Sequence, residues 1–215
     1  MIVPSFSARA AARTCTAFAA AALLSGLAFG QTPTAPPEPK KETIMPTGEK
    51  AGGKKDVAVI KTNLGTIVFE LLPDVAPKMV ENFQDLAKSG FYNGTTFHRV
   101  INGFMIQGGD PLSKDDDPSN DGTGSGPRKM PAEFTIKYSH TRGMVSSARS
   151  NDPNSGSCQF FIVQKDSKFL DNKYTIFGRV LEGIEVVDKI SLVTKGQNDR
   201  PVKNVVMESV SVENR

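Results

Sequence analysis

The chain has 215 residues, of which 26 are basic and 23 acidic, so its formal net charge is only +3. A charge this small gives no indication of the strongly basic surface that is typical of nucleic-acid-binding domains. With 38% hydrophobic and 23% charged residues, the chain is neither wholly disordered nor a membrane bundle. This length predicts one domain, with room for an appendage.

The N-terminal segment 1–30 has the pattern of a secretory signal peptide. Arg9 and Arg13 precede an uncharged stretch, 14–29, and small residues stand before the expected cleavage point at Gln31. The uncharged stretch is shorter than the roughly 20 apolar residues that a membrane-spanning helix needs. We therefore expect cleavage, no stable membrane insertion afterwards, and a periplasmic or extracellular location. An uncleaved membrane anchor is the alternative.

Cleavage would leave a single cysteine. It removes Cys15 together with Arg9 and Arg13, so the mature chain keeps only Cys158 and has a net charge of 24 minus 23, or +1. One cysteine cannot form an internal disulfide, and we expect it to be a buried, unreactive thiol.

Two regions follow the leader. Residues 31–55 are rich in Pro, Gly and Lys, which predicts a semi-extended linker outside any core. Residues 56–215 alternate short β-rich runs with turn residues, which predicts one compact domain.

The compact region contains many predicted strands and only two predicted helices. Two strands flanking residues 63–65 form a predicted hairpin, and one helix is expected from Pro77 to a stop at Gly90. A second helix is expected around residues 184–190. The other predicted strands are 96–101, 104–107, 143–148, 159–163, 174–181 and 205–212. This pattern predicts a closed or sandwiched antiparallel sheet.

The most informative segment is 97–110, with the sequence FHRVINGFMIQGGD. Alternation along its two predicted strands places Arg99 on one face with Phe97, and Gln107 on one face with Met105. A buried Arg is costly unless it is paired, and a solvent-facing strand seldom carries Met beside Gln. Such a face is typical of a ligand pocket with an apolar floor and a few hydrogen-bond donors. A strand edge with a solvated Arg is the alternative.

This segment resembles the signature of cyclophilin-type peptidyl-prolyl cis-trans isomerases. Further blocks similar to that family follow in order at 122–124 (GTG), 132–134 (AEF), 140–143 (HTRG), 157–162 (SCQFFI), 169–171 (FLD) and 174–180 (YTIFGRV). The resemblance covers residues 57–212. It implies a mainly β fold, a closed eight-stranded antiparallel barrel capped by two α-helices. It also implies an enzyme that rotates X-Pro peptide bonds without cofactor or metal.

The resemblance implies a role for each candidate site residue. Arg99 matches the donor that stabilises the twisted amide, and Gln107 matches the residue that orients Arg99 and holds the substrate carbonyl. The predicted substrate-binding residues are Phe104, Met105 and Phe161 around the proline ring, Phe169, Leu170 and Tyr174 at the outer wall, and Ala148 and Arg149 along the extended peptide. An extra residue near Ala148 leaves the register of the last two open.

Two positions depart from the common family pattern. Phe169 stands where the family frequently has Trp, and Tyr174 stands where it frequently has His. Both replacements resemble the bacterial secreted branch of the family. Phenylalanine lacks the indole N–H that the macrocycle cyclosporin uses as a donor, so we expect only weak cyclosporin binding.

The expected partners are unfolded or partly folded polypeptides that contain proline, among exported proteins whose folding the enzyme would assist. We expect a monomer that binds no nucleic acid. A non-catalytic chaperone or scaffold that grips proline segments is the alternative, although such a module would not need the Arg99 donor. His98 and His140 are expected to be structural, the acidic segment 115–121 to be a solvated loop without calcium, and the turn 195–201 to carry no chemistry.

Overall fold

The computed structural model describes residues 55–215, so the expected leader 1–30 and all but the last residue of the expected linker lie outside the described residues. The strands are β1 (Asp56–Thr62), β2 (Gly65–Leu71), β3 (Arg99–Ile101), β4 (Met105–Gly108), β5 (Met144–Ser147), β6 (Phe160–Val163), β7 (Ile176–Glu182) and β8 (Met207–Asn214). The α-helices are α1 (Pro77–Lys88) and α2 (Ile184–Ser191), and short 3₁₀ helices are η1 (Pro111–Lys114), η2 (Pro153–Ser155), η3 (Lys168–Leu170) and η4 (Gln197–Asp199).

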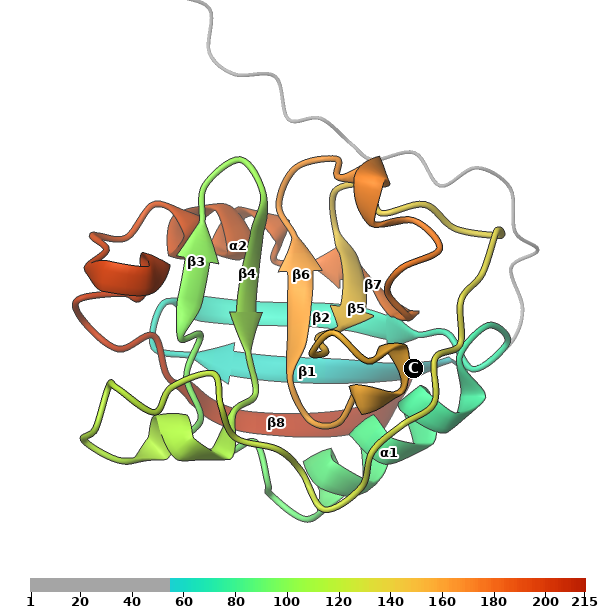
Figure 1. Ribbon diagram of the computed structural model, residues 1–215, viewed down its shortest axis with the longest axis horizontal. Helices are drawn as coiled ribbons and strands as arrows, with labels where there is room; N and C mark the ends of the chain where they lie inside the picture. The colour runs from blue at the N-terminus through green and yellow to red at the C-terminus, as the bar shows by residue number, and fades with distance from the viewer. Residues whose placement is uncertain (1–54) are drawn as a thin grey trace, which may run out of the picture. The chain divides into compact units, whose positions relative to one another are not determined.

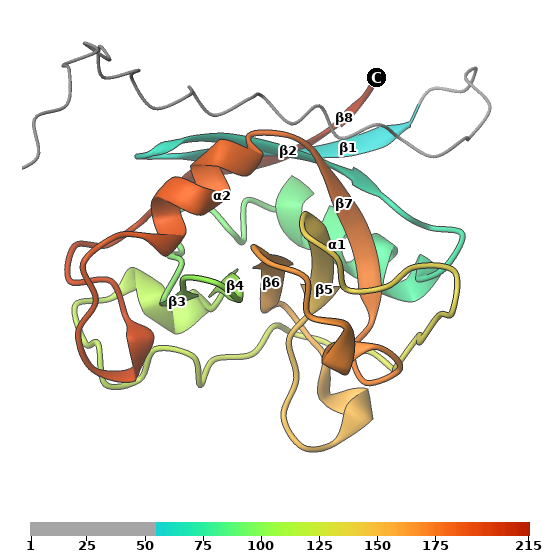
Figure 2. The ribbon, with the colours of Figure 1, turned by 90° about the horizontal axis from the view of Figure 1, so that it is seen from above.

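The strands form one antiparallel sheet in the order β3-β4-β6-β5-β7-β2-β1-β8. Figure 1 shows β3, β4, β6 and β5 in front of β2, β1 and β8 and running across them, because the sheet curls back on itself. Figure 2 shows the same two groups of strands as separate layers, with β7 passing between them. The predicted fold class, mainly β with antiparallel strands and two helices, is confirmed.

The predicted closed barrel is not what the structure shows. The end strands β3 and β8 do not pair with each other as a ladder. Residues 94–97, before β3, meet residues 205–207 through an isolated bridge between Thr96 and Val206 and three backbone hydrogen bonds. The physical reason is the length of β3, which has three residues and leaves too little extended backbone for a continuous ladder against the eight residues of β8. The fold is therefore a curled half-barrel.

The concave side of the sheet holds the main core. Val100, Ile106, Ile162 and Val145 lie on successive strands, are fully buried and belong to one apolar cluster. Phe97, which we expected on the same face as Arg99, is also in this cluster because β3 begins only at Arg99. Burying this many aliphatic and aromatic side chains supplies most of the stabilisation of the domain.

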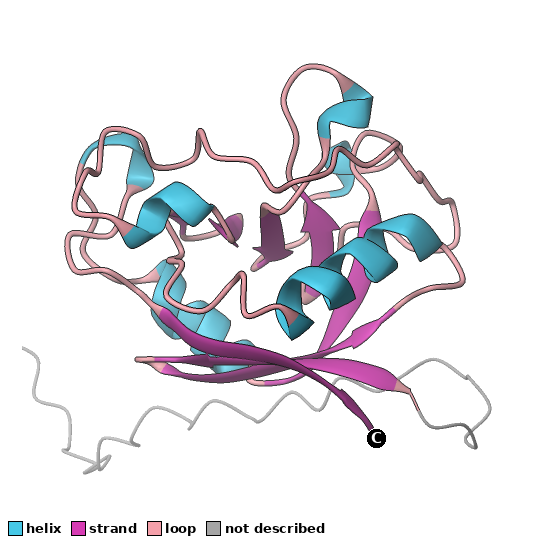
Figure 3. Ribbon diagram, turned by 90° about the horizontal axis from the view of Figure 1, so that it is seen from below, coloured by secondary structure: helices cyan, strands magenta, loops and turns pink. Residues whose placement is uncertain are grey.

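The two helices cover the curled sheet on opposite sides of its interior, as Figure 3 shows. Helix α1 begins with Pro77 at its first position and buries an apolar stripe that includes Phe83. Its cap residue, Ala76, has no side-chain acceptor, and Glu133 from a distant loop replaces it. The Glu133 carboxylate accepts the backbone N–H groups of Lys78 (3.1 Å) and Met79 (2.9 Å).

The first and last described residues pair with each other. The Lys55 N–H donates to the Arg215 carbonyl at 2.7 Å, and the Arg215 N–H donates to the Lys55 carbonyl at 3.0 Å. Lys55 also forms an ion pair with the buried Glu70 at 3.0 Å, and Glu70 accepts a second hydrogen bond from Arg179. In the part of the chain that the structure describes, no helix combines the length and the apolar character needed to cross a bilayer.

Candidate active site

A row of side chains crosses the outer face of β3, β4 and β6. The strand register places Arg99 opposite Gln107, and Gln107 opposite Phe161. Directly opposed residues on neighbouring strands have Cβ atoms about 4.5–5.5 Å apart, so the three side chains share one patch. The intervening residues Val100 and Ile106 point into the core. Two alternating strands thus bring the expected guanidinium and amide onto one outward face.

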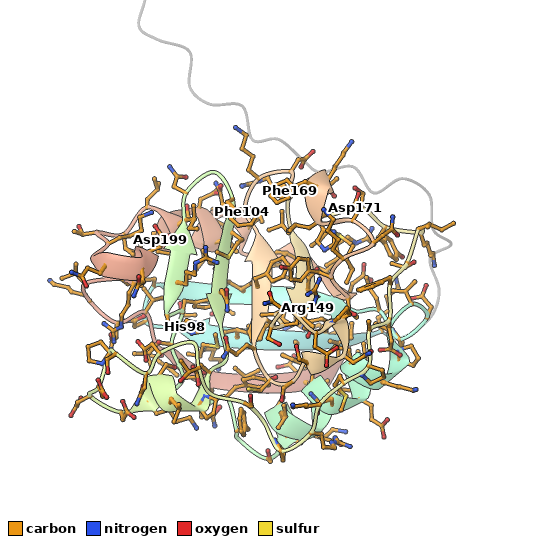
Figure 4. The ribbon with its side chains drawn as sticks, viewed as in Figure 1. His98, Phe104, Arg149, Phe169, Asp171 and Asp199 are labelled. Carbon is orange, nitrogen blue, oxygen red and sulfur yellow. The ribbon has the colours of Figure 1, made fainter. Side chains whose placement is uncertain are left out.

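An apolar cluster lies on the same outer face. Its buried members are Leu72, Met105, Met144, Phe161, Val163, Leu170 and Ile176, and partly buried residues packed against it include Phe104, Ala148 and Tyr174. Phe169 is 63% exposed and its ring stacks on Phe104 with centroids 5.6 Å apart. Figure 4 shows these two rings at one end of the β4–β6 face. The residues predicted to grip proline and to form the outer wall are therefore neighbours in space.

The side chain of Arg99 is exposed and makes no hydrogen bond or ion pair within residues 55–215. Its guanidinium carries five N–H donors and keeps its charge at every ordinary pH. Gln107, which we expected to orient Arg99, instead donates from Nε2 to Oε1 of Gln159 at 3.0 Å. Gln107 therefore lies beside Arg99, but its side-chain amide is held by Gln159 and not by Arg99.

Gln159 is a site residue that our sequence reasoning missed. Its Nε2 donates to the carbonyls of Gly122 (3.0 Å) and Gly124 (2.8 Å), while its Oε1 accepts from Gln107. The signal was present in the sequence, because Gln159 lies two residues before Phe161 and alternation places the two on one face. Gln159 thus connects the β4 amide to the glycine-rich turn.

That glycine-rich turn is held from beneath by Asp110. The buried Asp110 carboxylate accepts the N–H groups of Gly122 (2.5 Å) and Gly124 (3.1 Å). A Cβ atom at Gly124 would lie 2.0 Å from Oδ1 of Asp110, so only glycine lets the backbone approach the carboxylate this closely. The turn is consequently a fixed wall of the site.

Two cavities adjoin Gln107. One, of about 270 Å³, is lined by Ala148, Gln159 and the turn at Gly124, among others. The other, of about 850 Å³, extends past Arg99 toward residues 118–123 and 196–202. The site is therefore a groove that continues on both sides of Gln107 rather than a single pocket.

Arg149 and Tyr174 lie together beside this groove. The Arg149 guanidinium lies 4.6 Å from the centre of the Tyr174 ring, and its Nε donates to the Lys173 carbonyl at 2.9 Å. The Ala148 N–H donates to the Gln159 carbonyl at 2.9 Å. Ala148 and Arg149, which we predicted to contact the extended peptide, both lie at the groove. The Ala148 N–H and the Arg149 guanidinium already have partners within the protein.

The family model described as "Cyclophilin type peptidyl-prolyl cis-trans isomerase/CLD" matches residues 57–212. The chain belongs to the cyclophilin-type peptidyl-prolyl cis-trans isomerase family. The predicted family is thereby confirmed over nearly the whole described region.

Bacterial relatives match the cyclophilin domain over most of their own length. A protein of Brucella suis described as a peptidyl-prolyl cis-trans isomerase is 42% identical over 159 residues, which cover 72% of this chain and 80% of the relative. A Staphylococcus epidermidis protein with the same description is 36% identical over 188 residues and is covered to 90%. The mouse "Peptidylprolyl isomerase domain and WD repeat-containing protein 1" is 38% identical, but the chain spans only 27% of its length.

Solved cyclophilin structures share the fold. A cyclophilin-type peptidyl-prolyl cis-trans isomerase of Cryptosporidium parvum, crystallised in the presence of the dipeptide Ala-Pro, matches with a TM-score of 0.68 and 30% identity. The match covers 74% of this chain and 99% of that chain. A cyclophilin from Hirschia baltica matches with a TM-score of 0.58 and 30% identity, over 72% of each chain.

One histidine of this cyclophilin domain lies directly behind the apolar cluster. The buried His140 ring stacks on Phe161 with centroids 6.2 Å apart, and its Nδ1 lies 2.7 Å from Oδ1 of Asp171. Burial lowers the pKa of His140, although Asp171 opposes that shift. Burial raises the pKa of Asp171, but hydrogen bonds from Ser139 and His140 outweigh it and hold the pKa below its usual range. His140 therefore supports Phe161 as a neutral ring.

His98 and the Cys158 thiol, which also lie near the site, are kept neutral at neutral pH by burial. Burial lowers the pKa of His98 despite the nearby carboxylates of Asp110 and Asp121. Burial raises the pKa of the Cys158 thiol to about 11, so it stays protonated and unreactive at neutral pH. Residues 55–215 contain no group of three or more His, Cys, Asp or Glu side chains placed to hold a metal ion.

Proposed function

We propose that this protein catalyses rotation of X-Pro peptide bonds in polypeptide substrates. The observation that carries the proposal is the arrangement of Arg99, a cation without a partner among the described residues, in one row with Gln107 and Phe161 above an apolar floor. The floor fits the ring of proline, and the row offers hydrogen-bond donors beside it.

Rotation of an X-Pro peptide bond needs a hydrogen-bond donor more than it needs a group that transfers a proton. Rotation of a peptide bond crosses a barrier of about 18–20 kcal/mol because it breaks amide resonance. In the twisted transition state the prolyl nitrogen regains a lone pair, which Arg99 can meet with an N–H donor. A donor that binds the twisted amide more strongly than either planar form lowers the barrier. No proton is transferred in this reaction, which agrees with a site whose histidines and cysteine are held neutral.

Similar proteins support this assignment. The bacterial relatives are described as peptidyl-prolyl cis-trans isomerases, and the Cryptosporidium protein was crystallised in the presence of a proline-containing dipeptide. We extend both properties to this chain as a proposal. Its substrates would be unfolded or partly folded proteins, since uncatalysed proline isomerisation takes tens of seconds and can limit folding.

Replacement of Arg99 tests the mechanism. We expect Arg99→Ala to lower kcat/KM for a proline tetrapeptide by about 10²- to 10³-fold, as loss of a transition-state donor does elsewhere. A protease-coupled isomerisation assay measures this, with Arg128→Ala as the control because Arg128 pairs with Asp85 on α1, away from the row. Turnover by Arg99→Ala at the wild-type rate would refute the mechanism. Peptide binding by the wild-type protein without any turnover would favour a non-catalytic binding module.

We also propose that the protein is exported and assists the folding of exported proteins. The proposal rests on the sequence pattern of residues 1–30 and on the rate argument above. N-terminal sequencing of protein recovered from outside the cytoplasm should begin at Gln31, and recovery of uncleaved chain from the cytoplasm would contradict export.

A further inference from the structure

The larger cavity beside Arg99 differs in chemistry from the apolar cluster. This polar cleft has a volume of about 850 Å³. It is lined by His98, Arg99, Gln107 and Arg149, by residues 118–119 and 121–123, and by residues 196–198 and 200–202. Arg99 and Gln107 belong both to the cleft and to the row that leads to Phe161. A peptide whose proline contacts Phe161 would therefore place neighbouring residues within reach of the cleft, because an extended chain advances about 3.3–3.6 Å per residue.

The outer walls of the polar cleft are joined to each other. Asp121, at the end of the acidic loop, forms an ion pair with Arg200, from the turn that follows η4. Figure 4 shows Asp199, the neighbour of Arg200, beside β3. We expected the loop to be solvated and the turn to carry no chemistry. The loop is indeed exposed over residues 115–119, but its last residue fixes the two walls together.

The charged groups that line the polar cleft are mainly positive. They are Arg99, Arg149 and Arg200 against the single carboxylate of Asp121, which gives three minus one, or +2. The Asp121 side chain is only 5% exposed, whereas 22% of the Arg200 side chain remains accessible. The acidic residues 115–117 do not line the cleft. A ligand in the cleft therefore meets guanidinium groups rather than carboxylates.

We propose that the polar cleft binds an acidic side chain close to the proline of the substrate. This inference rests on the proposed isomerase function and names a class of substrate for it: proline segments that carry Glu or Asp near the proline. A guanidinium matches a carboxylate in shape and charge, and Arg200 is already held in position by Asp121. The excess positive charge of the cleft also attracts acidic segments before they dock.

Matched peptides test the inference. Pairs of proline peptides are compared by kcat/KM. The two peptides of a pair differ only in carrying Glu or Gln at one position. That position is placed in turn at each of the two positions on either side of the proline. At one of these positions we expect the Glu peptide to be favoured by about two- to fivefold, the range of a partly exposed ion pair. The preference should shrink as the salt concentration rises, because the charges are accessible to solvent.

Two variants should move the preference in opposite directions. Arg200→Gln removes a positive charge and should reduce the Glu over Gln preference, whereas Asp121→Asn removes the negative charge and should increase it. Arg128→Gln, which breaks the ion pair between Arg128 and Asp85 of α1, is the matched control and should leave the preference unchanged. A general loss of folding would lower turnover of both peptides together and could not produce opposite shifts in their ratio.

The outcomes separate this inference from the function on which it rests. Normal turnover of the Gln peptide without any preference for Glu at any position would overturn the inference alone. Shifts of the same sign in Arg200→Gln and Asp121→Asn would also overturn it. Failure of the wild-type protein to turn over either peptide would overturn the proposed function and this inference with it.

Discussion

Arg99 differs from the other arginines around the groove in the partners of its side-chain N–H groups. Arg149 donates to the Lys173 carbonyl and lies against the Tyr174 ring, and Arg200 pairs with Asp121. Arg99 has no such partner among the described residues, so its donors remain available to a ligand. A donor that must first break a protein hydrogen bond would lose much of its advantage in the transition state.

At residue 169 the structure supports a prediction about inhibitor binding. Phe169 is exposed and stacks on Phe104, so Phe169→Trp should keep the apolar contact and add an indole N–H at the surface. We expect cyclosporin to bind the variant about tenfold more tightly, since one added hydrogen bond contributes about 1 kcal/mol or slightly more. Isothermal titration calorimetry measures the change.

Phe169→Tyr is the control for this prediction. It adds a polar hydroxyl at a different point of the ring and should not reproduce the gain. Equal cyclosporin affinity in the wild type and Phe169→Trp would show that the missing indole donor is not what limits binding.

Single residues could be placed from the sequence where period-two alternation was strict. Arg99, Met105 and Gln107 were predicted on an outer face, and the register of β3 and β4 puts them there. Phe97 was placed wrongly because alternation was extended past the start of β3 into a segment that turns inward. The Gln107 to Gln159 bond joins residues 52 positions apart, and no local pattern reveals such a contact.

At the scale of elements, the hairpin of β1 and β2 and the start of α1 follow from local signals. Residues between the two strands favour a turn, and Pro77 occupies the first helical position as predicted. What no local signal shows is the cap of α1. The helix takes its acceptor from Glu133, which lies more than fifty residues later in the chain.

This remote cap can be tested by mutation. Glu133→Ala leaves the first N–H groups of α1 without an acceptor and removes a negative charge near the positive end of the helix dipole. We expect the free energy of unfolding to fall by about 1–2 kcal/mol, measured by urea denaturation. Glu81→Ala, an exposed change within the same helix, should have little effect. Equal losses in the two variants would show that the cap contributes nothing.

For the whole molecule, the two histidines set the response to acid. His98 and His140 are the only histidines of the chain, and burial lowers the pKa of both in the folded state. Below the ordinary histidine pKa of about 6.5 the unfolded chain binds more protons than the folded one. The stability that these residues contribute is therefore fully present above that pH and is lost as the pH falls toward the lowered folded values.

We accordingly expect the urea midpoint to fall between pH 7.5 and pH 5. His98→Gln should reduce the fall, because it removes one of the two titrating rings. The lowered pKa values of Asp171 and Asp188 add a further loss only at more acidic pH, where carboxylates titrate. A midpoint that stays constant or rises between pH 7.5 and pH 5 would contradict this account.

The family and the fold class could be predicted from the sequence because ordered motif blocks extend across the compact region. Whether the sheet closes could not. Closure depends on the pairing of the segment around Thr96 with the segment around Val206, and these residues are 110 positions apart in the chain. The polar cleft could not be predicted from the sequence for a similar reason, since Asp121 and Arg200 are far apart in the chain and meet only in the folded structure.

The pairing of Lys55 with Arg215 has a consequence for the connectivity of the chain. Because these residues exchange two backbone hydrogen bonds, a linker of a few residues could join them and turn the domain into a ring. New ends could then be opened in the exposed acidic loop at residues 115–119, where cutting breaks no strand. A circular permutant of this kind would keep every strand pairing of the active-site face while reversing which half of the sheet is synthesised first.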